Sequence, residues 1–121
     1  MVDRMRFDAF AEEVLSKHPQ VRYVATCRET CVYSTQRSGL ENASSSESDR
    51  YEELFVNPIV LKAVSQRGNL DCGGVRFFMI RYANFCQLII PTVWGHASFA
   101  LEGGAEYDSL ASKLSDLLRT L

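Results

Sequence analysis

The sequence predicts an α+β fold whose elements follow the order α-β-β-α-β-β-β-α. Three observations carry this prediction: an amphipathic helix pattern at each end, two short strand patterns near the start, and a dense block of strand patterns after residue 72. Strands joined by short turns form antiparallel sheets. We therefore expect a five-stranded antiparallel sheet, with the first and last helices on one face and the middle helix on the other.

The first half of the chain begins with a one-sided helix and a hairpin. Phe7, Phe10 and Val14 recur at helical spacing, and Pro19 ends the pattern. Residues 21–27 and 31–36 are rich in β-branched and aromatic side chains. Because three residues connect them, they predict a hairpin.

The middle of the chain predicts a polar loop and then a helix. Residues 38–49 are rich in Ser, Asn, Glu and Gly, and Ser44 and Glu47 have the spacing of a capping box. A helix is expected over 47–67, with Gly68 just after its end. Pro58 predicts either a kink or a second short helix with proline in its first turn.

The second half predicts three strands and a closing helix. Strands are expected over 75–82, 85–90 and 96–101, with tight turns between them. The last helix has the clearest 3.6-residue period in the chain. Its apolar stripe comprises Tyr107, Leu110, Ala111, Leu114, Leu117, Leu118 and Leu121.

Length and composition limit the classes of function. The chain has 121 residues, a formal net charge of −2 and 46% hydrophobic residues, which is typical of a single globular domain over 1–121. The charge gives no reason to expect nucleic acid or an anionic membrane as a partner. The N-terminus has no apolar signal segment, so we expect a cytoplasmic protein with four reduced cysteines.

The chemistry-bearing residues predict no catalytic site, no cofactor and no metal site. The weaker candidates for a zinc set are Cys27, Cys31, Cys72 and His96. Their spacing lacks a second C-x2-C or a paired histidine motif, and small buried thiols in strands explain them more simply. A Cys72–His96 catalytic pair would need an orienting third group, and no motif supplies one.

The element order resembles the roadblock (dynein light chain) family, a branch of the profilin-like and longin-like architectures. Several segments also resemble small uncharacterised prokaryotic roadblock-like proteins: Asn57-Pro58 through Arg67-Gly68, Asp71-Cys72-Gly73-Gly74, Arg81-Tyr82, Asn84-Phe85, Gln87-Leu88 and Gly95-His96. The resemblance implies a non-enzymatic protein that forms a homodimer through the strand after the middle helix and through the middle helices. It also implies a platform for Ras-like small GTPases.

The leading hypothesis is therefore a non-catalytic dimeric interaction module that acts as a scaffold or regulator of such a GTPase. Its expected interface residues are Tyr51, Leu54, Phe55, Leu61, Arg76 and Phe78. Pro58 and the long polar loop depart from the plainer family pattern where this dimer surface would lie.

Two alternatives stay open. One is a small-ligand sensor with a pocket beneath the middle helix, near Tyr33, Cys72 and His96. The other is a metal- or thiol-redox-responsive protein that uses Cys27, Cys31 and Cys72.

Overall fold

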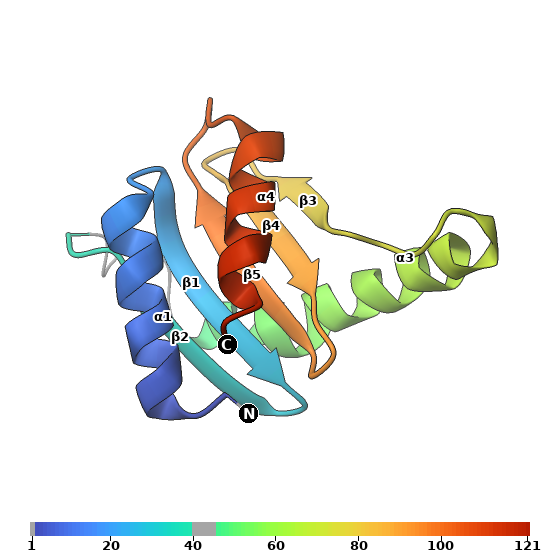
Figure 1. Cartoon of the computed structure of the whole chain (residues 1–121), viewed down its shortest axis with the longest axis horizontal. Helices are drawn as coiled ribbons and strands as arrows, with labels where there is room; N and C mark the ends of the chain where they lie inside the picture. The colour runs from blue at the N-terminus through green and yellow to red at the C-terminus, as the bar shows by residue number, and fades with distance from the viewer. Residues whose placement is uncertain (1, 40–45) are drawn as a thin grey trace.

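The computed structural model describes residues 2–39 and 46–121, and it confirms the predicted fold class (Figure 1). Its five strands form one antiparallel sheet in the order β2-β1-β5-β4-β3. The elements are α1 (Arg4–Lys17), β1 (Val21–Arg28), β2 (Cys31–Gln36), α2 (Ser46–Tyr51), the π-helical segment η1 (Glu52–Val56), α3 (Asn57–Asp71), β3 (Phe78–Arg81), β4 (Cys86–Pro91), β5 (His96–Leu101) and α4 (Tyr107–Leu118).

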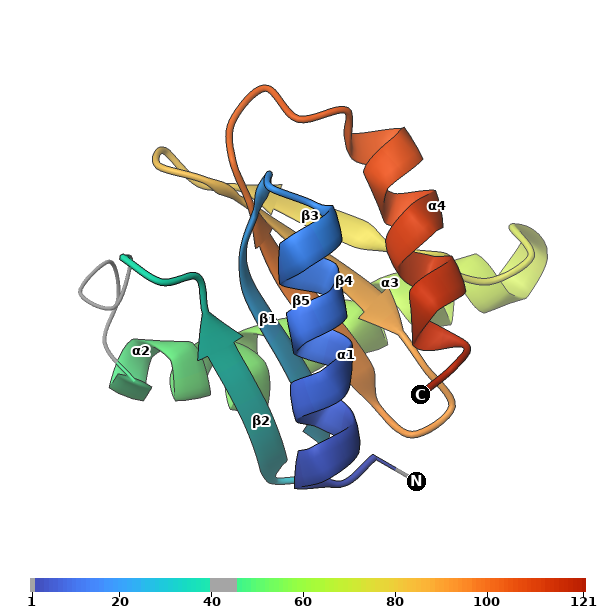
Figure 2. The same cartoon turned by 60° about the vertical axis from the view of Figure 1, so that its left-hand side comes forward.

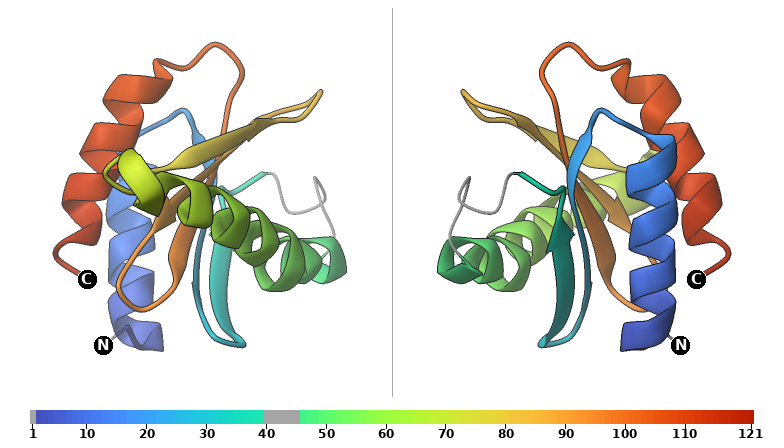
Figure 3. Two further views of the ribbon diagram at one scale, coloured as in Figure 1. Left: turned by 90° about the vertical axis from the view of Figure 1, so that its right-hand side faces the viewer. Right: turned by 90° about the vertical axis from the view of Figure 1, so that its left-hand side faces the viewer.

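The two faces of the sheet carry different layers. The helices α1 and α4 lie side by side on one face, and α2, η1 and α3 cross the other (Figures 2 and 3). The main apolar core fills the α1–α4 side, where Phe7, Leu88, Phe99 and Leu114 are fully buried. The opposite face has a much smaller apolar cluster around Tyr23, Ala25 and Ala100. No helix in the described ranges is both long and apolar enough to cross a membrane.

The first hairpin is tighter than the sequence predicts. β1 continues to Arg28, so a two-residue turn replaces the expected three-residue connection, and Glu29 adopts a positive φ of 56° there. The strand register pairs Cys27 with Val32 and Arg28 with Cys31. Because side chains alternate along a strand, Cys27 and Cys31 point to opposite faces of the sheet.

The middle helix runs from residue 46 to residue 71 without a break. The proline starts a helical segment, as the second expectation for Pro58 has it, but this segment is 15 residues long and continues directly from η1. Val56 and Asn57 keep helical dihedral angles, and Pro58 lies in the first turn of α3. The backbone N–H of Asn57 bonds to the carbonyl of Glu52, five residues earlier. This π turn widens the helix just before the residue that has no N–H to donate. Ser44 of the expected capping box lies outside the described residues.

The end of the middle helix also differs from the prediction, because Gly68 is buried inside α3 rather than following it. The backbone N–H groups of Cys72 and Gly74 both donate to the carbonyl of Gly68, so the chain folds back over this glycine. A Cβ at residue 68 would lie 3.1 Å from Val75 Cγ2. The close return of the chain, not a helix stop, favours glycine here.

The strand block is shorter at its start than expected. β3 spans four residues instead of 75–82, because the preceding segment follows the end of α3 with Gly73 and Gly74 at positive φ. β4 is shifted by one residue, and β5 matches its expected range. β3 lies at one edge of the sheet.

Candidate functional site

The middle helix packs on the sheet with a polar face toward the strands. Glu53 and Asn57 are completely buried, whereas Tyr51 and Phe55 are 62% and 53% exposed. The π turn places Glu53 and Asn57, four residues apart, on the same side of the helix. A buried carboxylate needs hydrogen-bond donors, so its surroundings define the first part of the site.

Three donors from three elements surround the Glu53 carboxylate. The Tyr23 hydroxyl of β1 donates to Oε2 at 3.0 Å, and the Asn57 amide of α3 donates to Oε1 at 3.1 Å. His96 Nε2, at the start of β5, lies 2.8 Å from Oε1 and donates to it. This cluster joins the middle helix to β1 and β5. Its hydrogen bonds offset the free-energy cost of burying the Glu53 carboxylate.

The Glu53 cluster changes the acidity of its neighbours. Burial and the adjacent Glu53 charge raise the pKa of the Tyr23 hydroxyl well above its usual range. Burial, followed by the Glu53 charge, raises the pKa of the Cys27 thiol to about 11. Both groups therefore stay protonated at neutral pH. Tyr23 can donate its hydrogen bond, and the Cys27 thiol is a poor nucleophile.

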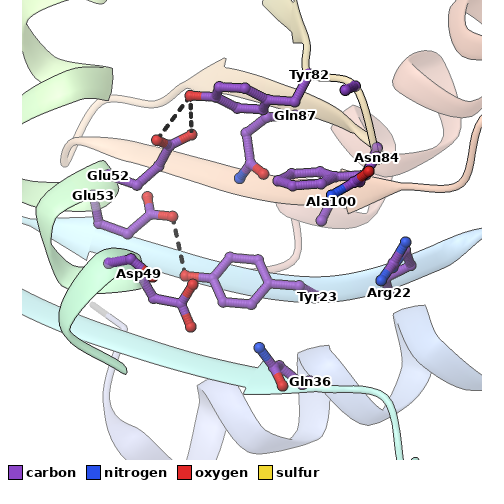
Figure 4. A pocket seen from close by; sticks show the side chains of 13 residues that line it. Arg22, Tyr23, Gln36, Asp49, Glu52, Glu53, Tyr82, Asn84, Gln87 and Ala100 are labelled. Atoms are coloured by element: carbon purple, nitrogen blue, oxygen red, sulfur yellow. Dashed lines mark hydrogen bonds between the residues drawn. The ribbon is translucent and has the colours of Figure 1, made fainter. Parts of the chain in front are cut away.

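A pocket of about 500 Å³ opens beside this cluster, between the start of the middle helix and the β3–β4 turn. Its lining combines carboxylates, aromatic rings and amides: Arg22, Tyr23, Gln36, Ser48, Asp49, Glu52, Glu53, Tyr82, Ala83, Asn84, Phe85, Gln87 and Ala100. Figure 4 shows Asp49, Glu52 and Glu53 together on the helix side, and Arg22 and Asn84 on the opposite side. The pocket thus has an acidic wall.

Glu52 is the half-buried carboxylate of that wall. The Tyr82 hydroxyl donates to both of its oxygens, at 3.1 and 3.0 Å. Burial raises the pKa of Glu52; the Tyr82 hydrogen bond opposes this rise, and the charges of Glu53 and Asp49 add to it. Burial and the hydrogen bond to Glu52 raise the pKa of Tyr82 to about 12.

The predicted interface residues fall into two groups. Tyr51 and Phe55 point outward from the middle helix with their rings 5.3 Å apart, and Arg76 is exposed just before β3. Leu54, Leu61 and Phe78 are half-buried. Phe78 pairs with Ile89, so it lies on the same sheet face as the middle helix.

The cysteine and histidine candidates lie in separate places. Cys27 is buried beneath the middle helix, and Cys31 is exposed at the other face. Cys72 is exposed at the end of α3, where Arg67 donates to its sulfur. His96 contacts Glu53. In the ranges 2–39 and 46–121, no three His, Cys, Asp or Glu side chains gather as a metal site would require.

The pocket is also not where the ligand hypothesis puts it. Tyr33 lies on the α1 side of the sheet, where its ring centroid is 5.7 Å from that of Phe7. Neither Tyr33, Cys72 nor His96 lines the observed pocket. Cross-strand parity places Tyr33 on the face opposite Cys27, because Tyr33 pairs with Thr26.

Sequence reasoning missed the residues that make this site, namely Tyr23, Glu52, Glu53, Asn57, Tyr82 and Gln87. One signal was present: Glu53 and Asn57 stand four residues apart, opposite the apolar residues of the same helix. A second was the polar content of β4 and β5, where Gln87, His96 and Ser98 alternate with apolar residues. Together they indicate a sheet face that is covered by a polar helix surface.

These features define the fold as that of the Roadblock/LC7 class: an antiparallel five-stranded sheet with two terminal helices on one face and a long middle helix on the other. The crystal structure of a Roadblock/LC7 domain from Streptomyces avermitilis superposes with a TM-score of 0.73. The match covers 93% of this chain and 92% of that domain at 10% sequence identity, so it establishes the fold alone. No protein-family model matches the sequence, and no curated protein matches it either.

Proposed function

We propose that this protein is a non-catalytic interaction module that acts as a homodimer. The observation that carries the proposal is an apolar stripe along the outer surface of the middle helix. Tyr51, Phe55, Ile59 and Leu70 are 62%, 53%, 67% and 78% exposed. Exposed apolar side chains grouped on one surface are typical of protein interfaces.

The free edge of the sheet is a second feature that favours a dimer interface on this side of the molecule. β3 is an edge strand, and its outer side bonds to no strand in the described part of the chain. Edge strands with free N–H and C=O groups readily accept another strand. The middle helix extends beyond the sheet on this side, so a second copy could contact β3 and the helix at once (Figures 1 and 3).

A second copy is the occupant that the geometry favours. A stable two-fold interface buries roughly 1,200–2,000 Å² in total, and a helix of 26 residues together with an edge strand offers surface on that scale. Of the interface residues expected from the sequence, Tyr51, Phe55 and Arg76 are exposed. Leu54, Leu61 and Phe78 are half-buried, and we keep all six as part of the proposed interface.

Size-exclusion chromatography with light scattering tests the dimer. The protein should elute at twice its 13.7 kDa mass at micromolar concentration. The variant Phe55→Glu/Ile59→Glu should elute as a monomer with an unchanged circular dichroism spectrum. Val93→Glu is the matched control, because Val93 is fully exposed in the β4–β5 turn. A wild-type protein that stays monomeric at these concentrations would refute the proposal.

The partner class rests on the fold resemblance alone, which supports a Ras-like small GTPase. We propose that the dimer presents its surface to such a protein as a scaffold or regulator. The same chromatography, run with a purified Ras-like GTPase from the same genome, should show co-elution with the dimer and not with the monomeric variant. Absence of a complex in both nucleotide states would remove the GTPase from the proposal.

The cytoplasmic location and the absence of enzymatic activity remain part of this proposal. A second candidate function, binding of a small ligand, is favoured by the pocket beside Glu53.

A further inference from the structure

The second edge of the sheet is formed by β2, and no strand in the described part of the chain pairs with its outer side. The strand order places β2 and β3 at opposite edges, and the proposed dimer uses only β3. Residues 31–36 include no charged residue and no proline, which are the usual features that keep an edge strand from pairing with another chain. The side chains of β2 therefore do not prevent the addition of a further strand.

The backbone of β2 presents hydrogen-bonding groups to this edge. The Arg37 N–H donates to the Arg22 carbonyl, and in an antiparallel pair the residues that bond to the partner strand alternate with residues that point away. Counted back from Arg37, the backbone N–H and C=O groups of Val32 and Ser34 point away from β1. An extended peptide adds to a sheet edge through groups arranged in this way.

A groove of about 510 Å³ lies between α1 and the end of β2. Figure 2 shows α1 lying along β2 on one face of the sheet. Ala11 and Leu15, one helical turn apart, form the apolar part of the lining, and Thr35 lines the groove from the strand side. Because alternate side chains of a strand point to the same face, a strand added to β2 would direct every second side chain toward the α1 side.

The charges of the groove favour a basic segment. Asp8 and Glu12 line the groove, are exposed, and stand one turn apart on α1. Neither carboxylate forms an ion pair within residues 2–39 and 46–121, and Arg4, one turn before Asp8, lies over the Tyr33 ring. Arg37 also lines the groove, but its guanidinium donates to three backbone carbonyls at 2.9–3.0 Å. The two carboxylates thus remain available to a lysine or arginine of a partner.

We propose that an extended, basic segment of a partner protein binds to the outer edge of β2 as a sixth strand. Its backbone bonds to Val32 and Ser34, a lysine or arginine side chain reaches Asp8 and Glu12, and an apolar side chain two positions away packs over Leu15. Residues two apart in a strand stand about 7 Å apart on one face, close to the roughly 5–6 Å between side chains one helical turn apart, so a single segment can reach both parts of the groove.

Selection of a phage-displayed library of random linear peptides on the immobilised wild-type protein tests the proposal. Enriched peptides should carry a lysine or arginine two positions from an apolar residue, and a synthetic copy of the most enriched peptide should bind with saturation in fluorescence polarisation. In amide hydrogen exchange, this peptide should protect the N–H groups of Val32 and Ser34 and leave those of β3 unchanged. Light scattering reports the dimer separately, so failure of peptide binding and failure of the proposed dimer are distinguishable.

Matched variants separate strand pairing from nonspecific charge effects. Ser34→Pro removes an N–H that points away from β1, so the β1–β2 pairing should remain and peptide binding should fall by about tenfold or more. Ser34→Ala, which keeps this N–H, should bind like the wild type. Asp8→Asn/Glu12→Gln should weaken binding by about fivefold, the loss expected for two exposed ion pairs, whereas Glu106→Gln/Asp108→Asn, the same charge change at the start of α4, should leave binding unchanged.

Three results would overturn the proposal. The first is that no peptide is enriched and saturates. The second is that the two double charge variants bind alike, or that a folded Ser34→Pro binds as tightly as Ser34→Ala. The third is a wild-type protein that forms tetramers which Ser34→Pro reduces to dimers, because this would assign the β2 edge to a second copy of the chain.

Discussion

The buried carboxylate of Glu53 should be a principal support of the middle helix, and its replacement gives the sharpest test of the fold. Glu53→Ala removes the acceptor of three buried donors, those of Tyr23, Asn57 and His96. Each buried donor left without an acceptor costs about 1–3 kcal/mol, and such costs are not additive within one network. We expect a loss of about 3–5 kcal/mol in the free energy of unfolding, similar to the breaking of a buried ion pair.

A graded series keeps this prediction testable if Glu53→Ala does not fold. In Glu53→Gln, the amide oxygen can replace Oε1, and the amide nitrogen can donate to the Tyr23 oxygen, so the loss should be about 1–2 kcal/mol. Tyr23→Phe removes one donor and should cost a similar amount. Glu52→Gln is the control, because the carboxylate of this half-buried neighbour accepts from the Tyr82 hydroxyl and an amide oxygen can still do so; it should cost less than about 1 kcal/mol.

Urea unfolding measures these differences. Circular dichroism reports helix content, and Trp94, the single tryptophan, reports the core of the α1–α4 layer that it packs against. Glu53→Ala should be the most destabilising variant, Glu53→Gln should come next, and Glu52→Gln should be the least destabilising. If Glu53→Ala were no more destabilising than Glu52→Gln, the network would not anchor the helix, and the argument from burial would fail.

Two further predictions concern a turn and the thiols. Gly95→Ala should lower the free energy of unfolding by about 3 kcal/mol or more, because the φ of Gly95 is 154° and a Cβ would overlap the Cys27 carbonyl oxygen. Gly104→Ala is the control in the same urea assay: with a φ of 87° and open space around it, it should cost only about 1 kcal/mol. With a thiol reagent at pH 8, the exposed Cys31 and Cys72 should react quickly, and Cys27 slowly, since a pKa of about 11 leaves roughly one thiol in a thousand ionised. The Cys27 rate should rise about tenfold for each pH unit up to that pKa, and equal rates for Cys27 and Cys31 at pH 8 would contradict the structure.

The periodic segments of this protein could be predicted from the sequence because their neighbours in the chain suffice to define them. The stripe of α4 repeats every three to four residues, and the range of β5 is bounded by a turn and by glycines, so both were found correctly. The same holds for the order of the elements and hence for the fold class. Tyr51 and Phe55 were expected at a dimer interface because of the family resemblance; both are exposed, and the interface stays a prediction.

Boundaries that depend on distant parts of the chain were predicted less well. Gly68 looks like a helix stop, but it lies within α3 because the chain returns across it as far as Val75. β3 is shortened because the residues before it follow that return instead of pairing with β4. Neither the position of Gly68 inside α3 nor the short β3 leaves a local sequence pattern, since both depend on how the chain packs back against α3.

The sequence by itself determined the element order, the periodicity of the outer helices and the antiparallel sheet. Only the tertiary structure decided which side of the middle helix faces the sheet. That helix has an apolar stripe at Tyr51 and Phe55 and a polar one at Glu53 and Asn57, and helical spacing allows either to be buried. The donors of Tyr23 and His96 on the sheet select the polar stripe, because they offer Glu53 the hydrogen bonds that a buried charge requires. This choice leaves the apolar stripe exposed on the outer side of the helix and places the acidic pocket on its sheet side.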